Sequence, residues 1–439
     1  MCSFTVTNNT NLDLRNTNQY SQRRGPDLTT TKNINGISIL HNLLHITGEQ
    51  TPQPFIDDDI VCVLNGEIYN FKEFGDYKSD GECLIPLYKE YGIEFAKKLD
   101  GEFAICIVDF KNSNLILIND TFATKPIWLG TNGHHWGVAS YESSLQACQL
   151  TSIEKLPGNT AWKLDLHTLT ELDSIQLVEF DLNQHKNSYD DWIIAFENSI
   201  RKRTQNTSQK IFLGLSAGYD SGAITCELLN QNINFKAYTI LSAEDKTTID
   251  SRHAKLNNGE IIQLSTNEYN NISLQVLNDC EDFSYNDKYK SYNIKIDKAS
   301  IGLAAICSRA NQDRYKIYLS GQGADEIISD YGHNGKKIYG HSSFGGLFPE
   351  SLKGFWPWHS FYNGTQIQYL NKEEYIAGAY GIETRYPFLD SKLVQEFLWL
   401  SSELKNKKYK APLDEYLNRN QFPFQQGMKT GFQANRNLI

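Results

Sequence analysis

The sequence predicts a protein of two domains, the second of which is a doubly wound α/β fold built on a parallel sheet. A chain of 439 residues is too long for one ordinary core. In its C-terminal half, short apolar runs typical of strands alternate with segments of helical character, as at residues 211–215, 235–240 and 316–319. Turns rich in small residues follow the first and last of these runs, and doubly wound sheets bind ligands at such strand ends.

Composition and charge exclude several classes of function. Hydrophobic residues make up 40% of the chain and aromatic residues 12%, which is enough for packed cores. The net charge of -10 argues against a nucleic-acid partner, and no apolar run approaches the roughly 20 residues that span a membrane. The N-terminus has no signal-peptide pattern, and the eight cysteines are isolated, without metal-site spacing. We therefore expect a cytoplasmic protein that binds neither nucleic acid nor a membrane.

Residues 216–221 (Ser-Ala-Gly-Tyr-Asp-Ser) lie between a predicted strand and a predicted helix. Such a turn directs several backbone N–H groups to one point, which suits a phosphate chain. Ser216 and Ser221 add hydroxyl donors, whereas Asp220 would repel a bare anion and therefore suggests a cation such as Mg²⁺. A turn without a ligand gives the same short pattern, so this stretch alone leaves both interpretations open.

A second small-residue turn, residues 320–326 (Ser-Gly-Gln-Gly-Ala-Asp-Glu), follows the predicted strand at 316–319. The carboxyl ends of parallel strands meet at one edge of the sheet, so Asp325 and Asp220 are expected to share one Mg²⁺. An acidic helix start stabilised by the helix dipole is the alternative for this turn. The presence of the first turn favours the metal site.

The N-terminal half carries a candidate nucleophile at Cys2. If Met1 is removed, the thiol lies beside a free α-amine, which titrates near 8 and can act as its general base. Position two alone is weak evidence, but several patterns follow: Arg-Gly-Pro-Asp at 24–27, Asn-Gly-Glu-Ile-Tyr-Asn at 65–70 and Ser-Asp-Gly-Glu at 79–82. The last pattern predicts an amphipathic helix capped by Ser79 or Asp80.

These segments, in this order, resemble the asparagine synthetase family, in which a class II glutamine amidotransferase domain precedes an ATP pyrophosphatase domain. Further similar segments lie at 99–104, 120–126, 138–140, 156–160, 381–390, 409–413 and 429–432. The resemblance implies an N-terminal-nucleophile αββα sandwich over residues 2–180 and the doubly wound synthetase domain over residues 190–439. The polar residues 181–188 are the expected linker, followed by a helix from 189 to about 201.

The resemblance also implies roles for individual residues. In the first domain, Cys2 would attack the glutamine amide, Asn65 and the N–H of Gly66 would form the oxyanion hole, and Glu67 and Asp80 would bind the glutamine α-amino group. In the second, Asp220 and Asp325 would bind Mg²⁺, and Lys410 would stabilise charge on the adenylate or pyrophosphate, although a solvated lysine is an equal alternative. The residues expected to bind ATP are Leu215, Ser216, Gly218, Asp220, Ser221, Ile240, Ser320 and Gly321. The Glu, Arg and Asp residues of segment 381–390 are expected to support the synthetase site.

The chain departs from the family pattern at several positions. Leu43 stands where the family has the arginine that binds the glutamine α-carboxylate, and no arginine occurs from residue 25 to residue 200. His45 or a lysine would have to compensate, and the loss of such a contact costs about 1.5–3 kcal/mol. Gln322 replaces a glutamate and cannot act as a base. The remaining departures are Asn119 and Asp414, both in place of arginine, and residues 329–331 in place of Gly-Gly-Tyr.

The leading interpretation is a glutamine-dependent asparagine synthetase, which converts ATP, aspartate and glutamine into asparagine, glutamate, AMP and pyrophosphate. The resemblance further suggests a homodimer. Two alternatives remain open: an amide-forming enzyme of the same family with another carboxylic acid substrate, and a non-catalytic binding protein. Leu43, Gln322, Asp414 and the short C-terminus give some support to the first alternative. The intact Cys2, Asp220, Ser221, Asp325 and Lys429 argue against the second.

Overall fold

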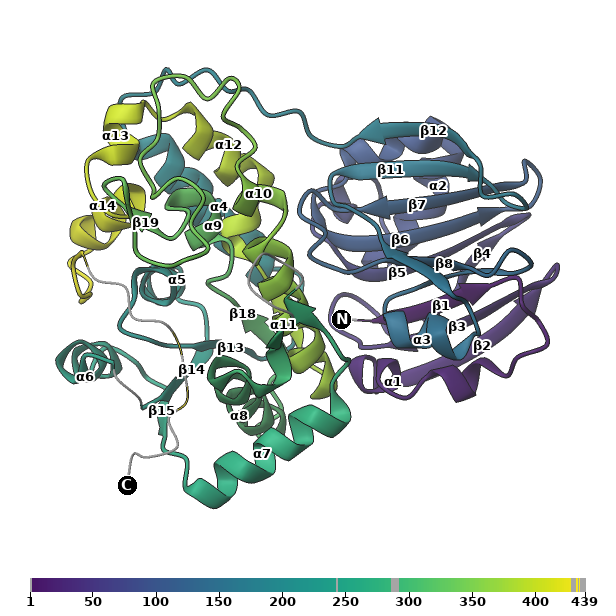
Figure 1. The fold of residues 1–439 in the computed structure, drawn as a ribbon, viewed down its shortest axis with the longest axis horizontal. Helices are drawn as coiled ribbons and strands as arrows, with labels where there is room; N and C mark the ends of the chain where they lie inside the picture. The colour runs from purple at the N-terminus through teal and green to yellow at the C-terminus, as the bar shows by residue number, and fades with distance from the viewer. Residues whose placement is uncertain (1, 242–243, 286–291, 428–431, 433, 435–439) are drawn as a thin grey trace.

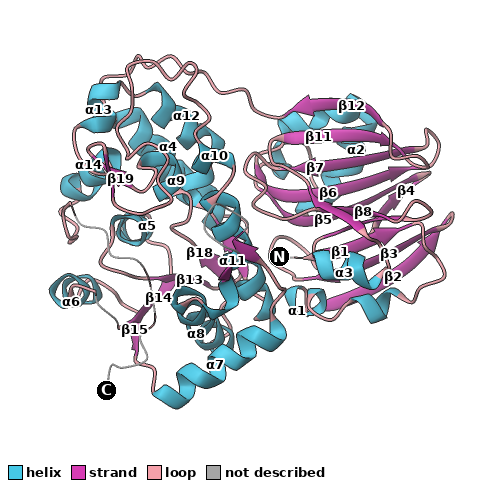
Figure 2. Ribbon diagram, in the orientation of Figure 1, coloured by secondary structure: helices cyan, strands magenta, loops and turns pink. Residues whose placement is uncertain are grey.

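The computed structural model describes residues 2–241, 244–285 and 292–427, together with Phe432 and Ala434. Two domains lie side by side: strands dominate the N-terminal one, and helices surround a five-stranded sheet in the C-terminal one (Figures 1 and 2). The predicted fold class is confirmed in both halves.

The N-terminal domain contains two antiparallel sheets of six strands each. The first has the order β10 (Ser152–Lys155), β8 (Trp128–Thr131), β9 (Trp136–Ala139), β1 (Ser3–Thr7), β3 (Ile37–Leu43) and β2 (Leu28–Ile34). The second has the order β12 (Glu171–Gln176), β11 (Thr160–Asp165), β7 (Asn114–Asn119), β6 (Gly101–Asp109), β5 (Ile60–Ile68) and β4 (Phe55–Asp57).

Side chains that alternate along the strands of the second sheet pack into two different hydrophobic cores. Along β6, Ile105 and Ile107 pack with α2 (Leu84–Tyr91), whereas Cys106 and Val108 pack with the first sheet. This alternation follows from the two-residue period of a strand. On the outer face of the first sheet, α3 (Glu142–Ala147) packs through Leu145. The resulting order of layers is helix, sheet, sheet, helix, as the sequence predicted.

The C-terminal domain contains a parallel sheet whose strand order reverses at its centre. Its strands are β15 (Gly259–Ile262), β14 (Phe235–Ile240), β13 (Ile211–Gly214), β18 (Ile317–Leu319) and β21 (Glu383–Arg385), in that spatial order. The chain moves outward from β13 in one direction and later returns to β18 on its other side. The loops after these two strands therefore lie together at the switch point, where doubly wound sheets bind ligands.

Helices cover both faces of this sheet, because right-handed connections on opposite sides of β13 carry them to opposite faces. One group packs around α5 and the other around α8. The first group is α4 (Asp190–Thr204), α5 (Tyr219–Asn230), α12 (Ser391–Trp399) and α14 (Ala411–Arg419). The second is α7 (Thr266–Asp279), α8 (Lys298–Gln312) and α11 (Thr365–Ala379). Shorter helices are α1 (Ser21–Arg24), α6 (Lys246–His253), α9 (Ala324–Ile328), α10 (His359–Tyr362) and α13 (Ser402–Asn406).

Three local expectations can be compared with these elements. The helix expected from residue 189 is α4, and the strand expected at 235–240 is β14. The helix expected after residue 79 begins as a 3₁₀ turn, Asp80–Cys83, and neither proposed capping side chain makes the expected hydrogen bond. The reason is that the Asp80 carboxylate accepts from the backbone N–H of Ile68 at 2.8 Å, which ties it to β5.

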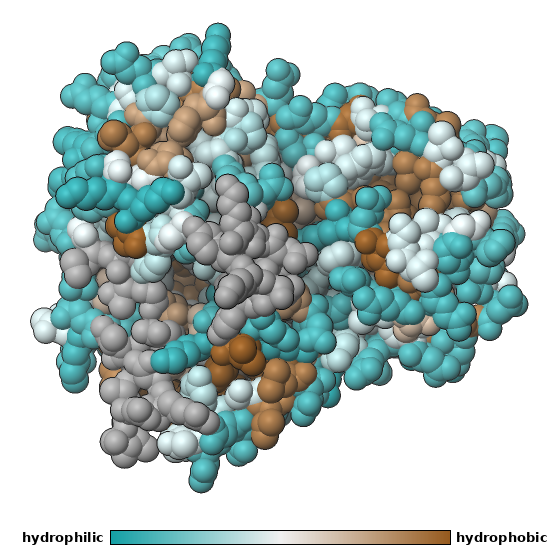
Figure 3. All heavy atoms as spheres, viewed as in Figure 1, coloured by the Kyte–Doolittle hydropathy of each residue, from teal (hydrophilic) through white to brown (hydrophobic). Residues whose placement is uncertain are grey.

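Burial and surface character agree with the composition. All eight cysteines are buried and unpaired. Hydrophilic residues predominate on the face drawn in Figure 3, and its hydrophobic residues form separate patches. Within the described residues, none of the helices has the length and apolar character needed to cross a membrane.

Buried ion pairs join the two domains. Arg24 of the first domain pairs with Glu374 of α11, and Lys125 approaches the same carboxylate at 3.0 Å. From the second domain, Arg203 binds Glu102 at 2.7 Å. All five side chains are at most 3% exposed. Removal of one member of such a group leaves a buried charge without compensation, which is costly.

We predict that Glu374→Gln destabilises the protein by about 3 kcal/mol, because the neutral amide cannot compensate the buried charges of Arg24 and Lys125. Urea unfolding monitored at both domains would measure the loss. The matched control is Asp250→Asn in the exposed pair with Lys246, which should change stability by less than about 0.5 kcal/mol. Equal effects of the two substitutions would contradict the expected cost of leaving Arg24 and Lys125 without a charged partner.

Candidate active sites

Cys2 lies at the start of the first domain, immediately before β1, and is only 6% exposed. Its thiol faces the carbonyl oxygen of Leu44 at 3.9 Å. Burial raises the pKa of the Cys2 thiol to about 11. Since the thiolate is the nucleophile, this thiol needs a base close by, and removal of Met1 would supply one in the form of the Cys2 α-amine.

Asn65 and Gly66 lie near the end of β5, where the oxyanion hole was expected. Asn65 is fully buried, and neither its amide nitrogen nor its amide oxygen has a hydrogen-bond partner among the described residues. A buried amide without partners costs stability, so a ligand that accepts its hydrogen bond would offset that cost. Gly66 has φ +135°, and a Cβ at this position would lie 2.0 Å from the carbonyl oxygen of Glu102. The position therefore requires glycine.

Glu67 and Asp80, the expected ligands of the glutamine α-amino group, lie at the same end of β5 and are almost fully buried. The Thr47 hydroxyl donates to the Glu67 carboxylate. Burial raises the pKa of Glu67 above its usual range and that of Asp80 to about 7, and Glu383 adds to both shifts. A cationic ligand would offset this concentration of negative charge.

His45, considered as a substitute for the missing arginine, is engaged with another group. Leu43 is buried at the end of β3. The His45 ring contacts the carbonyl oxygen of Gly48 at 2.8 Å. Asn119, the second departure in this domain, donates to the carbonyl oxygens of Leu156 and Pro157 at 3.0 and 3.1 Å. Position 119 therefore supports the 156–157 turn.

The second site is a cavity of about 340 Å³ at the carboxyl ends of β13 and β18. Most of the residues expected to bind ATP and metal line it: Ser216, Gly218, Asp220, Ser221, Ser320, Gly321, Asp325 and Lys410. Leu215 and Ile240 do not line it and are buried in the core. The Leu215 carbonyl accepts from the Thr239 hydroxyl, so this residue braces β13 against β14.

Lys410 bridges the two carboxylates expected to bind metal. Its ammonium lies 2.5 and 2.7 Å from the Asp220 oxygens and 2.8 Å from an Asp325 oxygen. Burial opposes its charge, but the two carboxylates outweigh this and raise the pKa of Lys410 well above its usual value. The residues present fit Mg²⁺, which prefers oxygen ligands and is commonly held by one or two carboxylates together with substrate phosphates. Lys410 is thus no solvated surface lysine.

The phosphate-type loop is closed by internal hydrogen bonds. The Ser221 hydroxyl accepts from the Ser216 N–H at 3.0 Å. The Ala217 N–H donates to the carboxylate of Glu244 at 2.6 Å, so an internal anion uses a donor that suits a phosphate oxygen. Behind the loop, the buried Arg252 donates to the Ser216 carbonyl, and its Nη2 has no hydrogen-bond partner among the described residues. Glu244 and Arg252 belong to no motif, so no sequence signal identifies either residue.

Gln322 and Glu373 both line this cavity. The Gln322 N–H donates to the Ser320 hydroxyl at 3.0 Å, and its side-chain nitrogen is buried without a hydrogen-bond partner among the described residues. One carboxylate oxygen of Glu373 in α11 is likewise buried without a hydrogen-bond partner among the described residues. Burial raises the pKa of Glu373 to about 7, and a hydrogen bond from Ser320 limits the shift. An acid with this pKa can act as a base near neutral pH, although sequence reasoning did not identify it.

Segment 381–390 differs from expectation. Arg385 and Asp390 were expected to support the synthetase site, yet Arg385 approaches Glu67 at 3.4 Å and Asp390 binds Arg203 at 3.1 Å. The reason is topological, because β21 is the edge strand of the parallel sheet. The expected Lys-x-Gly-Phe segment lies outside the described residues at 429–431, and its last residue, Phe432, lines the cavity.

Comparisons with known proteins agree with a division of the chain into two different domains. A family model described as "Glutamine amidotransferase domain" matches residues 1–156, and one described as "Asparagine synthase" matches residues 192–363. A relative in Methanocaldococcus jannaschii, provisionally named a glutamine-hydrolyzing asparagine synthetase, is 27% identical over 86% of this chain and 72% of its own. The glutamine-hydrolyzing asparagine synthetases of Gallus gallus and Homo sapiens are 27% and 26% identical over 91% and 88% of this chain, and over 76% and 74% of their own.

We predict that Glu244→Ala strengthens ATP binding about fivefold, equivalent to roughly 1 kcal/mol, because the Ala217 N–H loses an internal competitor for phosphate. Titration calorimetry with Mg-ATP would measure the change. Asp250→Ala removes an exposed carboxylate from the neighbouring α6 and serves as the control for net charge. Weaker ATP binding by Glu244→Ala would instead mean that this carboxylate contributes to the nucleotide site.

Proposed function

The chain belongs to the family that joins a glutamine amidotransferase domain to an asparagine synthase domain, and from this premise we propose that it is a glutamine-dependent asparagine synthetase. As an ATP-dependent amide-forming enzyme it would convert aspartate, glutamine and ATP into asparagine, glutamate, AMP and pyrophosphate. The observation that carries the proposal is the convergence of Asp220, Asp325 and Lys410 at the switch point of the parallel sheet.

In the synthetase site, the β-carboxylate of aspartate would attack the α-phosphorus of ATP and release pyrophosphate. A bound Mg²⁺ would supply charge neutralisation, with Asp220 and Asp325 as its protein ligands. Lys410 would then turn from these carboxylates to the phosphoryl oxygens on which negative charge develops. The loop around Ser216 and Ser221 would orient the phosphate chain through its N–H and hydroxyl groups.

In the glutaminase site, the Cys2 thiolate would attack the side-chain carbonyl of glutamine. Asn65 and the N–H of Gly66 would donate to the oxyanion, and the buried carboxylates of Glu67 and Asp80 would hold the α-ammonium group. Ammonia would leave and water would release glutamate from the thioester. In the other domain, ammonia would displace AMP from the aspartyl adenylate and give asparagine.

A second candidate is an amide-forming enzyme of the same family with a different carboxylic acid. Two observations favour it: the aromatic side chains of Tyr331, Tyr339 and Tyr369 line one part of the cavity, and Gln322 replaces the family's glutamate. A non-catalytic binding protein is the third candidate. Pyrophosphate release separates both enzymes from it. A homodimer and a cytoplasmic location are further proposals that rest on the family resemblance.

We expect the wild-type protein to release pyrophosphate from Mg-ATP with aspartate and to form asparagine with either glutamine or ammonium. Cys2→Ala should abolish the glutamine-dependent reaction and leave the ammonium-dependent rate within about twofold, because only the first site uses the thiol. Paired assays of pyrophosphate and asparagine would measure both. Pyrophosphate release with another acid but not with aspartate would replace the proposal by the second candidate.

Glu373 is expected to accept the proton that the attacking nitrogen loses. Because its pKa is raised to about 7 and the deprotonated form is active, amide formation should fall as the pH drops below 7. Glu373→Gln should reduce amide formation about 100-fold and remove this acidic limb, with adenylation retained. Rates measured at a fixed concentration of free ammonia would test this, and Glu373→Asp should recover part of the activity. A wild-type acidic limb in Glu373→Gln would exclude the role.

A further inference from the structure

The glutamine site lacks the arginine that binds the substrate α-carboxylate in the family pattern. Position 43 is leucine, and the first domain contains no arginine after Arg24. An amino acid carries its ammonium and carboxylate groups on the same carbon, so the groups that bind them must be neighbours. A replacement cation should therefore lie close to Glu67 and Asp80, the expected partners of the α-ammonium group.

Arg24 is close to this site but is fully engaged. Its Nε donates to the Cys2 carbonyl at 2.8 Å, and its Nη1 donates to the Glu374 carbonyl at 2.9 Å. Its Nη2 pairs with the Glu374 carboxylate. Every nitrogen of this guanidinium therefore has a partner. Arg24 orients the backbone of Cys2 and has no nitrogen available for the substrate.

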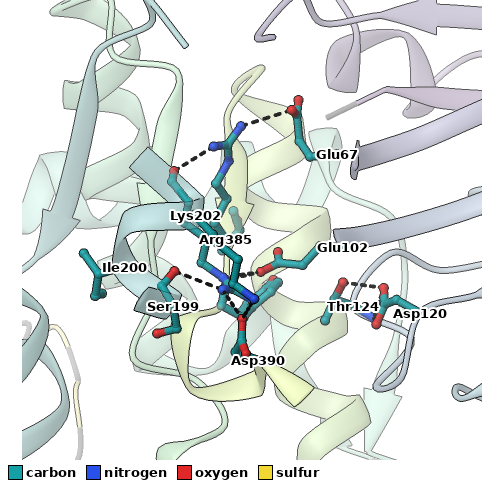
Figure 4. A network of polar contacts seen from close by, with 12 residues as sticks. Glu67, Glu102, Asp120, Thr124, Ser199, Ile200, Lys202, Arg385 and Asp390 are labelled. Carbon is teal, nitrogen blue, oxygen red and sulfur yellow. Dashed lines mark hydrogen bonds and ion pairs between the residues drawn. The ribbon is translucent and has the colours of Figure 1, made fainter. Parts of the chain in front are cut away.

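Arg385 reaches the site from the other domain. Its side chain extends from β21, and Figure 4 shows the guanidinium directed at the Glu67 carboxylate. Its Nε donates to Glu383 at 2.7 Å and its Nη1 to the Arg203 carbonyl at 2.7 Å. Its Nη2 lies 3.4 Å from Glu67 and has no hydrogen-bond partner among the described residues, although the side chain is only 1% exposed.

We propose that Arg385 binds the α-carboxylate of glutamine in place of the residue missing at position 43, so that the synthetase domain completes the glutaminase site. The inference rests on the proposed glutaminase activity. Without substrate, Arg385 partly neutralises Glu67. When glutamine binds, its α-ammonium group neutralises Glu67 and Asp80 in place of Arg385. The Nη2 of Arg385 can then donate to the α-carboxylate of the bound glutamine.

The test measures ammonia release by the full chain from glutamine and from 4-aminobutanamide, which has no α-carboxylate and gives 4-aminobutanoate as its other product. For Arg385→Gln we expect the KM for glutamine to rise about 10- to 100-fold, the range of one lost charge-assisted hydrogen bond. The KM for 4-aminobutanamide should change less than about threefold. The wild-type preference for glutamine would then largely disappear.

Arg203→Gln is the matched control, since it removes another buried arginine from the same interface. It should lower stability, but its backbone carbonyl still accepts from Arg385 Nη1, so the preference for glutamine should fall by less than about threefold. If Arg385→Gln does not fold, Arg385→Lys keeps the charge without the planar fork and should show a smaller loss of preference. An equal rise in both KM values, or an unchanged preference, would overturn the proposal. Absence of ammonia release from glutamine by the wild-type enzyme would instead refute the proposed glutaminase activity.

Discussion

The ion pairs buried between the domains are the interaction on which the rest of the structure depends. Arg24, Lys125 and Glu102 on one side meet Glu374 and Arg203 on the other, with almost no solvent contact. Buried charges of this kind contribute little to net stability compared with apolar packing, but they strongly disfavour wrong arrangements, because any displacement leaves a charge unpaired. They fix the relative position of the domains, and with it the approach of β21 to the Cys2 site.

The strand order of the parallel sheet provides the second constraint. Since β18 lies beside β13, the loops at 216–221 and 320–326 converge although about 100 residues separate them in the sequence. The helix α11 links this site to the interface. Its adjacent acids face different ways, with Glu373 in the cavity and Glu374 between the domains, because neighbouring side chains on a helix point about 100° apart.

Much of the fold follows from the sequence, because motifs and the alternation of strands and helices occupy contiguous stretches. The same motifs predict Cys2, Asn65, Asp220 and Asp325 as site residues, and the structure places the last two in one cavity. Residues whose role depends on contacts made only in the folded structure carry no motif in the sequence. Arg385 sits in a recognised segment, but which domain its side chain faces depends on how β21 packs at the sheet edge. The burial of Leu215 and Ile240 outside the cavity has the same cause, since a residue at the end of a strand can face either the core or the cavity.

The position of Arg385 also affects whether the two domains can function independently of each other. The first domain ends in sequence before α4, yet the charge that balances Glu67 comes from β21, some 200 residues later. A fragment limited to the first domain would expose Arg24, Lys125 and Glu102 to water and lose the guanidinium beside Glu67. Recombination that exchanged either domain for a homologue would have to preserve this contact. The two domains are separate folds that depend on one common interface. Substitutions on the two sides of this interface would therefore be expected to evolve together.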